Sequence, residues 1–201
     1  MSGVVLVDAG GANLGSVRWA LCRLGVEPLV TADAAAIRGA RRVILPGVST
    51  AGTVMRRLRE LGLVDTLRQL RQPLLGVCVG MQLLFEHSEE DGAQCLGLLA
   101  GRVERLPARP GVRVPHMGWN RLEVVRDDPL LAGIDDGAWA YFVHSYAAPA
   151  TADCVAACTH GRRFAAVVRR GNVMGAQFHP ERSSSTGEAI LRNFLEMEAA
   201  A

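Results

Sequence analysis

Lysine is absent from this sequence: all 22 basic residues are arginine, against 20 acidic residues. Without lysine the chain has no side-chain amine for Schiff-base chemistry, so that class of covalent catalysis is excluded. The formal net charge is only +2, which gives no electrostatic case for binding a nucleic-acid backbone. We therefore expect neither a lysine-dependent enzyme nor a nucleic-acid-binding protein.

Long apolar runs are also missing, because glycine, arginine or aspartate interrupts each run well short of a membrane span. The first four residues carry no basic segment, so no signal peptide is expected. The five cysteines, at positions 22, 78, 95, 154 and 158, are odd in number and lack the spacing of a disulfide scaffold. Cys154 and Cys158 lie four apart without a second pair, so no metal site is expected. These features predict a cytoplasmic protein with no membrane association.

The first half of the chain alternates between strand-like and helix-like segments. Apolar runs predict strands at 3–8, 27–30, 42–45 and 73–77, and helical periodicity predicts helices at 14–24 and 52–71. This alternation is typical of an α/β fold with a central, mostly parallel sheet flanked by helices. Sites in such sheets form at the carboxyl ends of the strands, where Asp8, Pro46-Gly47 and Cys78 fall.

The second half is rich in strand-like segments and predicts antiparallel pairing. These segments cover 102–106, 119–125, 139–146, 154–159 and 163–175, and a helical pattern closes the chain at 188–197. Residues 170–172, Arg-Gly-Asn, separate two β-rich runs and predict a hairpin. No linker or repeat divides the chain, so residues 1–201 are expected to form a single domain.

A glycine-flanked cysteine stands at the centre of the first half. Gly76-Val77-Cys78-Val79-Gly80 follows an apolar strand and precedes a helical pattern that begins near Met81. In the strand–turn–helix context, this arrangement predicts a nucleophile lifted clear of the sheet edge by a tight turn. The alternative, a small buried hydrophobe, stays open on this stretch alone because most free cysteines are of that kind.

A base for that nucleophile is predicted near the end of the chain. His179 directly follows a strand-like run, and Pro180 ends that run. In extended chain the side chains of His179 and Glu181 would leave the same face, so the carboxylate could hold the imidazole as the third member of a triad. The alternative is an ordinary histidine at a strand end with no catalytic role.

Taken together, these motifs resemble a known family. Gly-Val-Cys-Val-Gly-Met-Gln at 76–82 and Gln-Phe-His-Pro-Glu at 177–181 are similar to the class-I, triad-type glutamine amidotransferases. Within that family the chain resembles the glutaminase subunits of imidazole glycerol phosphate synthase. The narrower resemblance rests on Pro-His-Met-Gly-Trp-Asn at 115–120, Tyr-Phe-Val-His-Ser-Tyr at 141–146, Asn13-Leu14 and Pro46-Gly47-Val48.

The resemblance implies a role for each matching residue. Cys78 would attack the side-chain amide of glutamine, His179 would take and return the proton, and Glu181 would orient His179. Backbone N–H groups of Val79 and of the Gly47–Val48 segment would hold the oxyanion. Four further residues would bind glutamine: Gln82, His144, Ser145 and Tyr146. No metal or organic cofactor is implied, because amide hydrolysis needs only the triad and the oxyanion donors.

The resemblance also implies a partner. Ammonia would pass directly to a (β/α)8-barrel cyclase subunit, in a heterodimer that serves histidine biosynthesis. Trp119 would be an aromatic anchor of that interface; the alternative, without the resemblance, is a core aromatic residue in a β-turn. The implied partner contacts are Asn13, Pro115, His116, Met117, Trp119, Asn120 and Arg182.

Four positions depart from the family pattern. Ala9 and Ala12 replace tyrosine and glycine, Arg182 replaces lysine, and Ser49 replaces the last glycine of the oxyanion segment. Arginine keeps the charge but changes its geometry. The family's oxyanion segment is thought to flip a peptide when the partner's site is occupied, and serine resists the positive φ that glycine adopts freely. Ser49 is therefore expected to affect gating more than chemistry.

Three other functions compete with this interpretation. The same triad could serve anthranilate, aminodeoxychorismate or GMP synthesis, or a free-standing cysteine hydrolase such as a γ-glutamyl hydrolase. A non-enzymatic scaffold subunit would have lost its triad. The intact Cys78, His179 and Glu181 favour an active enzyme, and the 115–120 segment favours the histidine-biosynthesis type.

Overall fold

A single eight-stranded sheet forms the centre of the computed structural model, which describes residues 3–10 and 13–198. Five neighbouring strands are parallel and three are antiparallel, as the two halves of the sequence predicted. The parallel strands, in spatial order, are β2 (Leu29–Thr31), β1 (Val4–Val7), β3 (Arg42–Gly47), β4 (Leu74–Cys78) and β14 (Val173–Ala176). The antiparallel strands continue the order as β13 (Arg162–Arg170), β12 (Cys154–His160) and β9 (Glu123–Val124).

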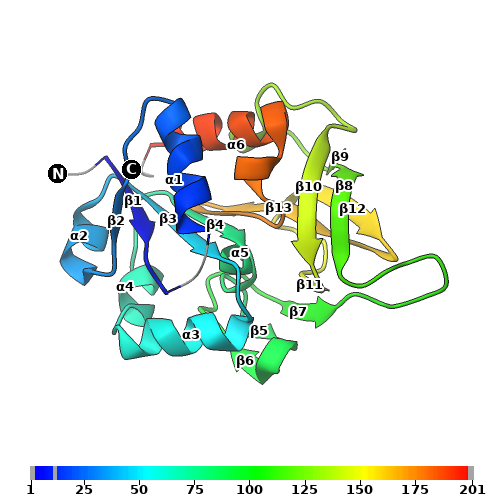
Figure 1. The fold of residues 1–201 in the computed structure, drawn as a ribbon, viewed down its shortest axis with the longest axis horizontal. Coiled ribbons are helices and arrows are strands. Elements are labelled where there is room, and N and C mark those ends of the chain that lie inside the picture. The colour runs from blue at the N-terminus through cyan, green and yellow to red at the C-terminus, as the bar shows by residue number, and fades with distance from the viewer. Residues whose placement is uncertain (1–2, 11–12, 199–201) are drawn as a thin grey trace.

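Helices cover both faces of this sheet. Helices α1 (Leu14–Arg23) and α6 (Ser184–Glu196) lie on one side, and α3 (Ala51–Glu60) and α4 (Val64–Arg68) lie on the other (Figure 1). Because both faces are covered, β1, β4 and β14 are buried along their whole length, which explains their continuous apolar sequence. The short helix α2 (Ala34–Gly39) lies beside β2, and α5 (Val79–Gln82) follows β4 directly.

Two small sheets lie beyond the central one. The first pairs β10 (Trp139–His144) with β8 (His116–Arg121), and the second contains β11 (Tyr146–Ala147), β7 (Arg102–Arg105), β5 (His87–Ser88) and β6 (Ala93–Gln94). Three 3-10 turns complete the fold: η1 (Glu90–Gly92), η2 (Pro129–Leu131) and η3 (Pro180–Arg182). The predicted hairpin at 170–172 is confirmed, because β13 and β14 pair antiparallel across it.

The predicted helix at 52–71 is wrong in one respect, since the structure divides it into α3 and α4. Gly62 has a φ of +66°, its N–H bonds to the carbonyl of Arg59, and the N–H of Leu63 bonds to the carbonyl of Leu58. This pair of bonds is the Schellman motif that ends a helix.

The helix predicted to begin near Met81 is also different, because α5 spans only Val79–Gln82. The carbonyls of Leu83, Leu84 and Phe85 accept hydrogen bonds from the amides of residues 96–99. These long-range bonds satisfy groups that a longer helix would have used, so tertiary structure overrides the local helical pattern. Helix α2, which the sequence analysis missed, is capped by Asp33, whose side chain accepts from the N–H of Ala36.

The two glycines around Cys78 are required by close backbone approach. A Cβ atom on Gly80 would lie 1.8 Å from the carbonyl oxygen of Leu45, and one on Gly76 would lie 2.5 Å from the carbonyl oxygen of Gly80. Any side chain at either position would push α5 away from β3 and β4. The elbow therefore depends on glycine at these two positions for space.

No helix among the described residues is both long enough and apolar enough to cross a membrane.

We expect Gly80→Ala to destabilise the protein by about 1–3 kcal/mol or more, because the methyl group cannot be accommodated without backbone movement. Gly15→Ala in helix α1 is the matched control, since a Cβ there meets nothing within 4 Å. That control is expected to stabilise by about 0.5–1 kcal/mol. Chemical denaturation of both variants checks this, and equal stability of Gly80→Ala and the parent would contradict the account of the elbow.

Candidate active site

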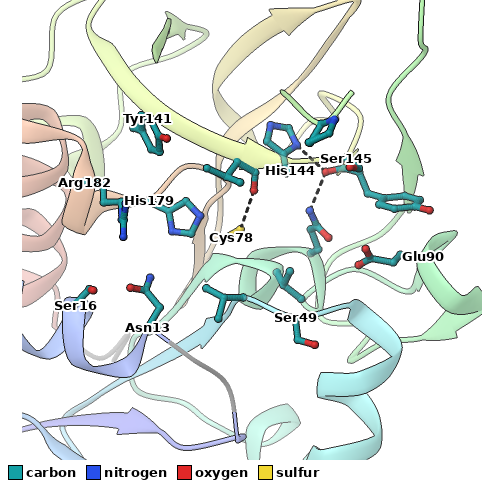
Figure 2. A pocket seen from close by; sticks show the side chains of 16 residues that line it. Asn13, Ser16, Ser49, Cys78, Glu90, Tyr141, His144, Ser145, His179 and Arg182 are labelled. Atoms are coloured by element: carbon teal, nitrogen blue, oxygen red, sulfur yellow. Dashed lines mark hydrogen bonds between the residues drawn. The ribbon is translucent and has the colours of Figure 1, made fainter. Parts of the chain in front are cut away.

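The carboxyl ends of three parallel strands meet at a cavity of about 700 Å³. Gly47 at the end of β3 pairs with Cys78 at the end of β4, and Ala176 of β14 pairs with Val77. His179 follows β14 by three residues, so the register brings it to the same edge. Figure 2 shows Cys78 and His179 facing the cavity from neighbouring elements. The edge that the sequence analysis selected therefore does hold a cavity.

Most of the predicted site residues line this cavity. It brings together the predicted nucleophile and base, the predicted oxyanion segment and the predicted glutamine-binding residues. The lining residues among those predicted are Cys78, His179, Val48, Val79, Gln82, His144, Ser145, Tyr146, Asn13, Pro115 and Arg182.

Cys78 occupies a strained backbone conformation. Its φ is +56° and its ψ is −114°, a region that residues with a side chain rarely adopt. The Sγ atom lies 3.8 Å from the carbonyl oxygen of Val143 and 4.0 Å from Nε2 of Gln177. Such strain persists only where the surrounding structure imposes it, and it is found preferentially at active sites. The sequence prediction of a sharp turn at the nucleophile agrees with this geometry.

His179 and Glu181 form a buried pair. His179 Nδ1 lies 2.8 Å from Oε1 of Glu181, whose side chain is only 1% exposed. The route by which they meet differs from the one predicted: Pro180–Arg182 is a 3-10 turn, not extended chain. Burial lowers the pKa of His179, but interactions with the side chains of Cys78 and Glu181 outweigh burial and raise it to about 10. His179 therefore carries a proton at neutral pH in the free protein.

Asn13 holds the same carboxylate from the opposite end of the chain. Its Nδ2 donates to Oε1 of Glu181 at 2.6 Å, across 168 residues of sequence. Burial raises the pKa of Glu181, but the hydrogen bonds from His179 and Asn13 outweigh it and leave the pKa below its ordinary value. The sequence analysis assigned Asn13 to a partner interface and missed this inward contact, for which no local pattern gives a signal.

The 3-10 turn that carries Glu181 is fixed by its neighbours. Ser183 Oγ donates to the carbonyl of His179 at 2.7 Å and accepts from the N–H of Tyr141 at 2.9 Å. A Cβ atom on Gly187 of α6 would lie 1.9 Å from the carbonyl oxygen of Pro180, so this helix presses directly against the turn. The sequence analysis did not predict a role at the site for Ser183 or Gly187.

Two backbone segments flank the nucleophile where an oxyanion would form. Val79 begins α5, and Val48 follows the Gly47 position that pairs with Cys78. Both valines line the cavity, beside Ser49. The backbone at Ser49 lies outside the left-handed region in this structure.

Gln82 is buried with its amide nitrogen already engaged. Its Nε2 donates to the carbonyl of Tyr146 at 2.8 Å and to Oε1 of Gln177 at 3.0 Å. Its own Oε1 is buried without a protein partner and lies in a residue that lines the cavity. Gln177, quoted in the sequence motif but assigned no role there, links Gln82 to the nucleophile.

The residues predicted at the partner interface divide into two groups. Met117 and Trp119 of β8 are 65% and 50% exposed, whereas His116 is buried and Asn120 half-buried on the same strand. This alternation is the ordinary two-residue period of a strand. Pro115 and Arg182 line the cavity. Ala9 is buried, and Ala12 lies outside the described residues.

Metal ligands do not gather at this site: among the described residues, no three histidine, cysteine, aspartate or glutamate side chains are arranged to hold a metal ion. A strained cysteine beside a protonated imidazole held by a buried carboxylate is the arrangement of cysteine-dependent acyl transfer.

Comparison with known proteins agrees with that chemistry. Residues 5–197 match the family model for class-I glutamine amidotransferases. The chain therefore belongs to the class-I glutamine amidotransferase family, as the sequence motifs predicted.

Two individual relatives are similar to this chain over nearly its whole length. The chain is 62% identical over 200 residues to the imidazole glycerol phosphate synthase subunit HisH of Xylella fastidiosa strain Temecula1, with all of both chains covered. It is 64% identical over 197 residues to the subunit of the same name from Xanthomonas oryzae pv. oryzae, with 98% of both chains covered.

Solved structures share the fold. One crystal structure of a glutamine amidotransferase matches with a TM-score of 0.76 at 25% identity, covering 97% of this chain and 98% of the other. A Trypanosoma brucei glutaminase domain with bound acivicin matches with a TM-score of 0.66 at 14% identity, covering 100% of this chain and 96% of the other. The predicted fold class is thus confirmed.

We expect Glu181→Gln to lower the pKa of His179 from about 10 towards its ordinary value of 6.5, because the carboxylate no longer stabilises the imidazolium. The protonated form contributes stability that is fully present below about pH 6.5 and lost as the pH rises towards 10. That loss should be smaller in the variant. Glutamine hydrolysis should fall by roughly 10²–10⁴-fold.

The measurements are an NMR titration of the His179 ring and the rate of glutamate formation. Glu188→Gln on helix α6 is the matched control, because Glu188 forms a surface ion pair with exposed Arg192. An unchanged His179 pKa in Glu181→Gln would contradict the assignment.

Proposed function

We propose that this chain is the glutaminase subunit of an imidazole glycerol phosphate synthase. In this proposal residues 1–201 form one cytosolic amidotransferase domain that hydrolyses L-glutamine and delivers the ammonia to a (β/α)8-barrel cyclase subunit. The observation that carries it is the full-length identity of 62–64% with subunits of that name. The cavity lined by Cys78 and His179, with Glu181 hydrogen-bonded to His179, supports the chemistry.

The first half-reaction forms a thioester. The Sγ atom of Cys78 attacks the side-chain amide carbon of glutamine, and negative charge develops on the amide oxygen. Backbone N–H groups at Val79 and Val48 are the proposed oxyanion donors, and each such donor typically lowers the barrier by about 3–4 kcal/mol. The carbon–nitrogen bond then breaks. His179 gives its proton to the leaving nitrogen, so ammonia departs as a neutral molecule.

The second half-reaction releases glutamate. The now neutral His179 takes a proton from a water molecule as that water attacks the thioester carbon. The carbon–sulfur bond breaks, the sulfur leaves with its electron pair, and His179 is again protonated. Glu181 stays ionised throughout and holds the imidazole through Nδ1, so that Nε2 faces the reacting atoms. We assign Gln82 and the His144–Tyr146 segment, all of which line the cavity, to binding glutamine.

The ammonia must reach its acceptor without entering bulk water, where it would be protonated and lose its nucleophilicity. A second protein seated over the cavity would supply that seal. The exposed face of the β10–β8 sheet supports this location: Trp119 pairs with Tyr141 and Met117 pairs with Val143, and both partners line the cavity. The docking face, defined as Met117, Trp119 and Trp139, is half-exposed or more. Exposed aromatic clusters of this kind are typical interface anchors.

A second candidate keeps the same triad but serves another acceptor, as in anthranilate, aminodeoxychorismate or GMP synthesis. The 115–120 segment and the docking face built from it favour the cyclase instead. A scaffold without activity is disfavoured by the intact catalytic geometry.

We expect this chain alone to release ammonia from glutamine slowly. Adding a barrel cyclase with its nucleotide ligand bound should raise turnover by roughly tenfold or more, a coupling of the size typical between two sites. Cys78→Ala is the control and should be inactive in the same mixture. Rapid turnover by the chain alone would instead indicate a free-standing hydrolase. No turnover under either condition would favour the non-enzymatic scaffold subunit.

Ser49→Gly should increase this stimulation. A positive φ costs roughly 1–2 kcal/mol for a residue with a side chain, so glycine at this position should make a peptide flip in the oxyanion segment easier, with up to about a tenfold gain in stimulated turnover. Ser49→Ala is the matched control, since alanine removes the hydroxyl but keeps the Cβ atom. The idea fails if both variants show the steady-state kinetics of the parent in the complex.

A further inference from the structure

Two buried histidines form a hydrogen-bonded pair behind the cavity. His116 of β8 is 4% exposed and His144 of β10 is 6% exposed. Nδ1 of His116 lies 3.0 Å from Nε2 of His144, and Nδ1 of His144 lies 2.8 Å from the carbonyl oxygen of Tyr146. His144 lines the cavity and His116 does not. The mechanism described above makes no use of His116.

The hydrogen-bond partners of the two rings determine where the protons of this pair lie. A carbonyl oxygen can only accept, so Nδ1 of His144 carries a proton and donates to Tyr146. Burial lowers the pKa of His144 to about 3, so the ring is neutral and its Nε2 can only accept. Nδ1 of His116 must therefore be the donor in the bond between the two rings.

The tautomer of His116 follows in the same way from the group that its Nε2 faces. Burial lowers the pKa of His116 to about 4, so with Nδ1 protonated its Nε2 accepts. The group it faces is Nδ2 of Asn120 at 3.2 Å, which also donates to the carbonyl of Thr159 at 3.0 Å. The hydrogen bonds therefore all run in one direction: Asn120 donates to His116, and His116 donates to His144.

This series of hydrogen bonds continues from His144 to the nucleophile. The carbonyl of Tyr146 that accepts from His144 also accepts from Nε2 of Gln82, which in turn donates to Gln177. Gln177 Nε2 lies 4.0 Å from the Sγ atom of Cys78. The segment that carries the docking face is thereby connected, through buried polar groups alone, to the residues that surround the substrate.

We propose that His116 is a positioning residue for glutamine binding, acting by donating its Nδ1 proton to His144. This donation holds His144 with its own proton on Nδ1, and so fixes the Tyr146 carbonyl and the Gln82 side chain that it anchors. The inference rests on the proposed role of the cavity as a glutamine site.

A purely structural role for His116 makes a different prediction. The ring stacks on His160 with centroids 4.0 Å apart and on Phe142 at 4.9 Å. If stacking were the whole function, any aromatic ring would serve. If donation is the function, an amide that places a nitrogen near the Nδ1 position should serve better than a ring without nitrogen.

Three variants of His116 separate these roles. His116→Phe keeps a ring and loses the donor, His116→Asn keeps a donor and loses the ring, and His116→Leu has nearly the size of asparagine with neither. Each is made in the full chain with Cys78→Ala, so that glutamine binds without reacting, and its Kd is measured calorimetrically alone and with the barrel cyclase.

We expect His116→Phe and His116→Leu to weaken glutamine binding by roughly tenfold, as expected for a buried acceptor left without its donor. His116→Asn should bind within about threefold of the parent. In ¹⁵N NMR spectra of the folded variants, the Nε2 resonance of His144 should shift towards a free, non-bonded nitrogen in the phenylalanine and leucine variants only.

Each remaining outcome overturns a distinct claim. If the parent binds glutamine and His116→Phe binds it equally well, the inference about His116 fails and the proposed function stands. If phenylalanine preserves binding and asparagine does not, the ring alone matters. If the parent with Cys78→Ala does not bind glutamine under either condition, the proposed function itself fails. Should the phenylalanine variant not fold, the asparagine and leucine pair still decides the question.

Discussion

The structure depends on the close packing of α5 against the ends of β3 and β4. Gly80 lies so near the carbonyl of Leu45 that no side chain fits between them, and Cys78, at the junction of β4 and α5, adopts a φ of +56°. Because the strain at Cys78 is imposed by this packing, the reactive geometry is present before any ligand binds. Pre-organisation of this kind lowers the reorganisation that the reaction itself must supply.

The second constraint is a single carboxylate oxygen shared by two donors. Oε1 of Glu181 accepts from His179 and from Asn13, which come from opposite ends of the chain. The site is therefore assembled from the first helix, the central strands and the final turn before α6. The site as a whole therefore draws on both halves of the sequence, although the strands of the two halves pair differently. This shared oxygen ties the orientation of the base to the packing of α1, a helix whose start also reaches the cavity through Asn13 and Ser16.

Much of this could be predicted from the sequence because the decisive signals are local. The parallel strands appear as short apolar runs, the elbow as two glycines around Cys78, and the base and its carboxylate as neighbours in one motif. What the sequence did not reveal depends on contacts between distant residues. The shortening of α5 follows from hydrogen bonds to residues 96–99, and the inward roles of Asn13 and His116 follow from packing that their own segments do not encode. His116 was expected at a partner interface because the resemblance assigns the 115–120 segment to it, yet the two-residue period of β8 turns His116 towards the core.

The central claim is that Cys78 forms a covalent thioester with glutamine. The most direct measurement is mass spectrometry of the complex with a barrel cyclase, quenched with acid during steady turnover of glutamine and digested under acidic conditions. The account predicts a glutamyl adduct on the peptide that contains Cys78, and no such adduct in Cys78→Ala. Turnover without any adduct on Cys78, or with an adduct on another residue, would contradict the account.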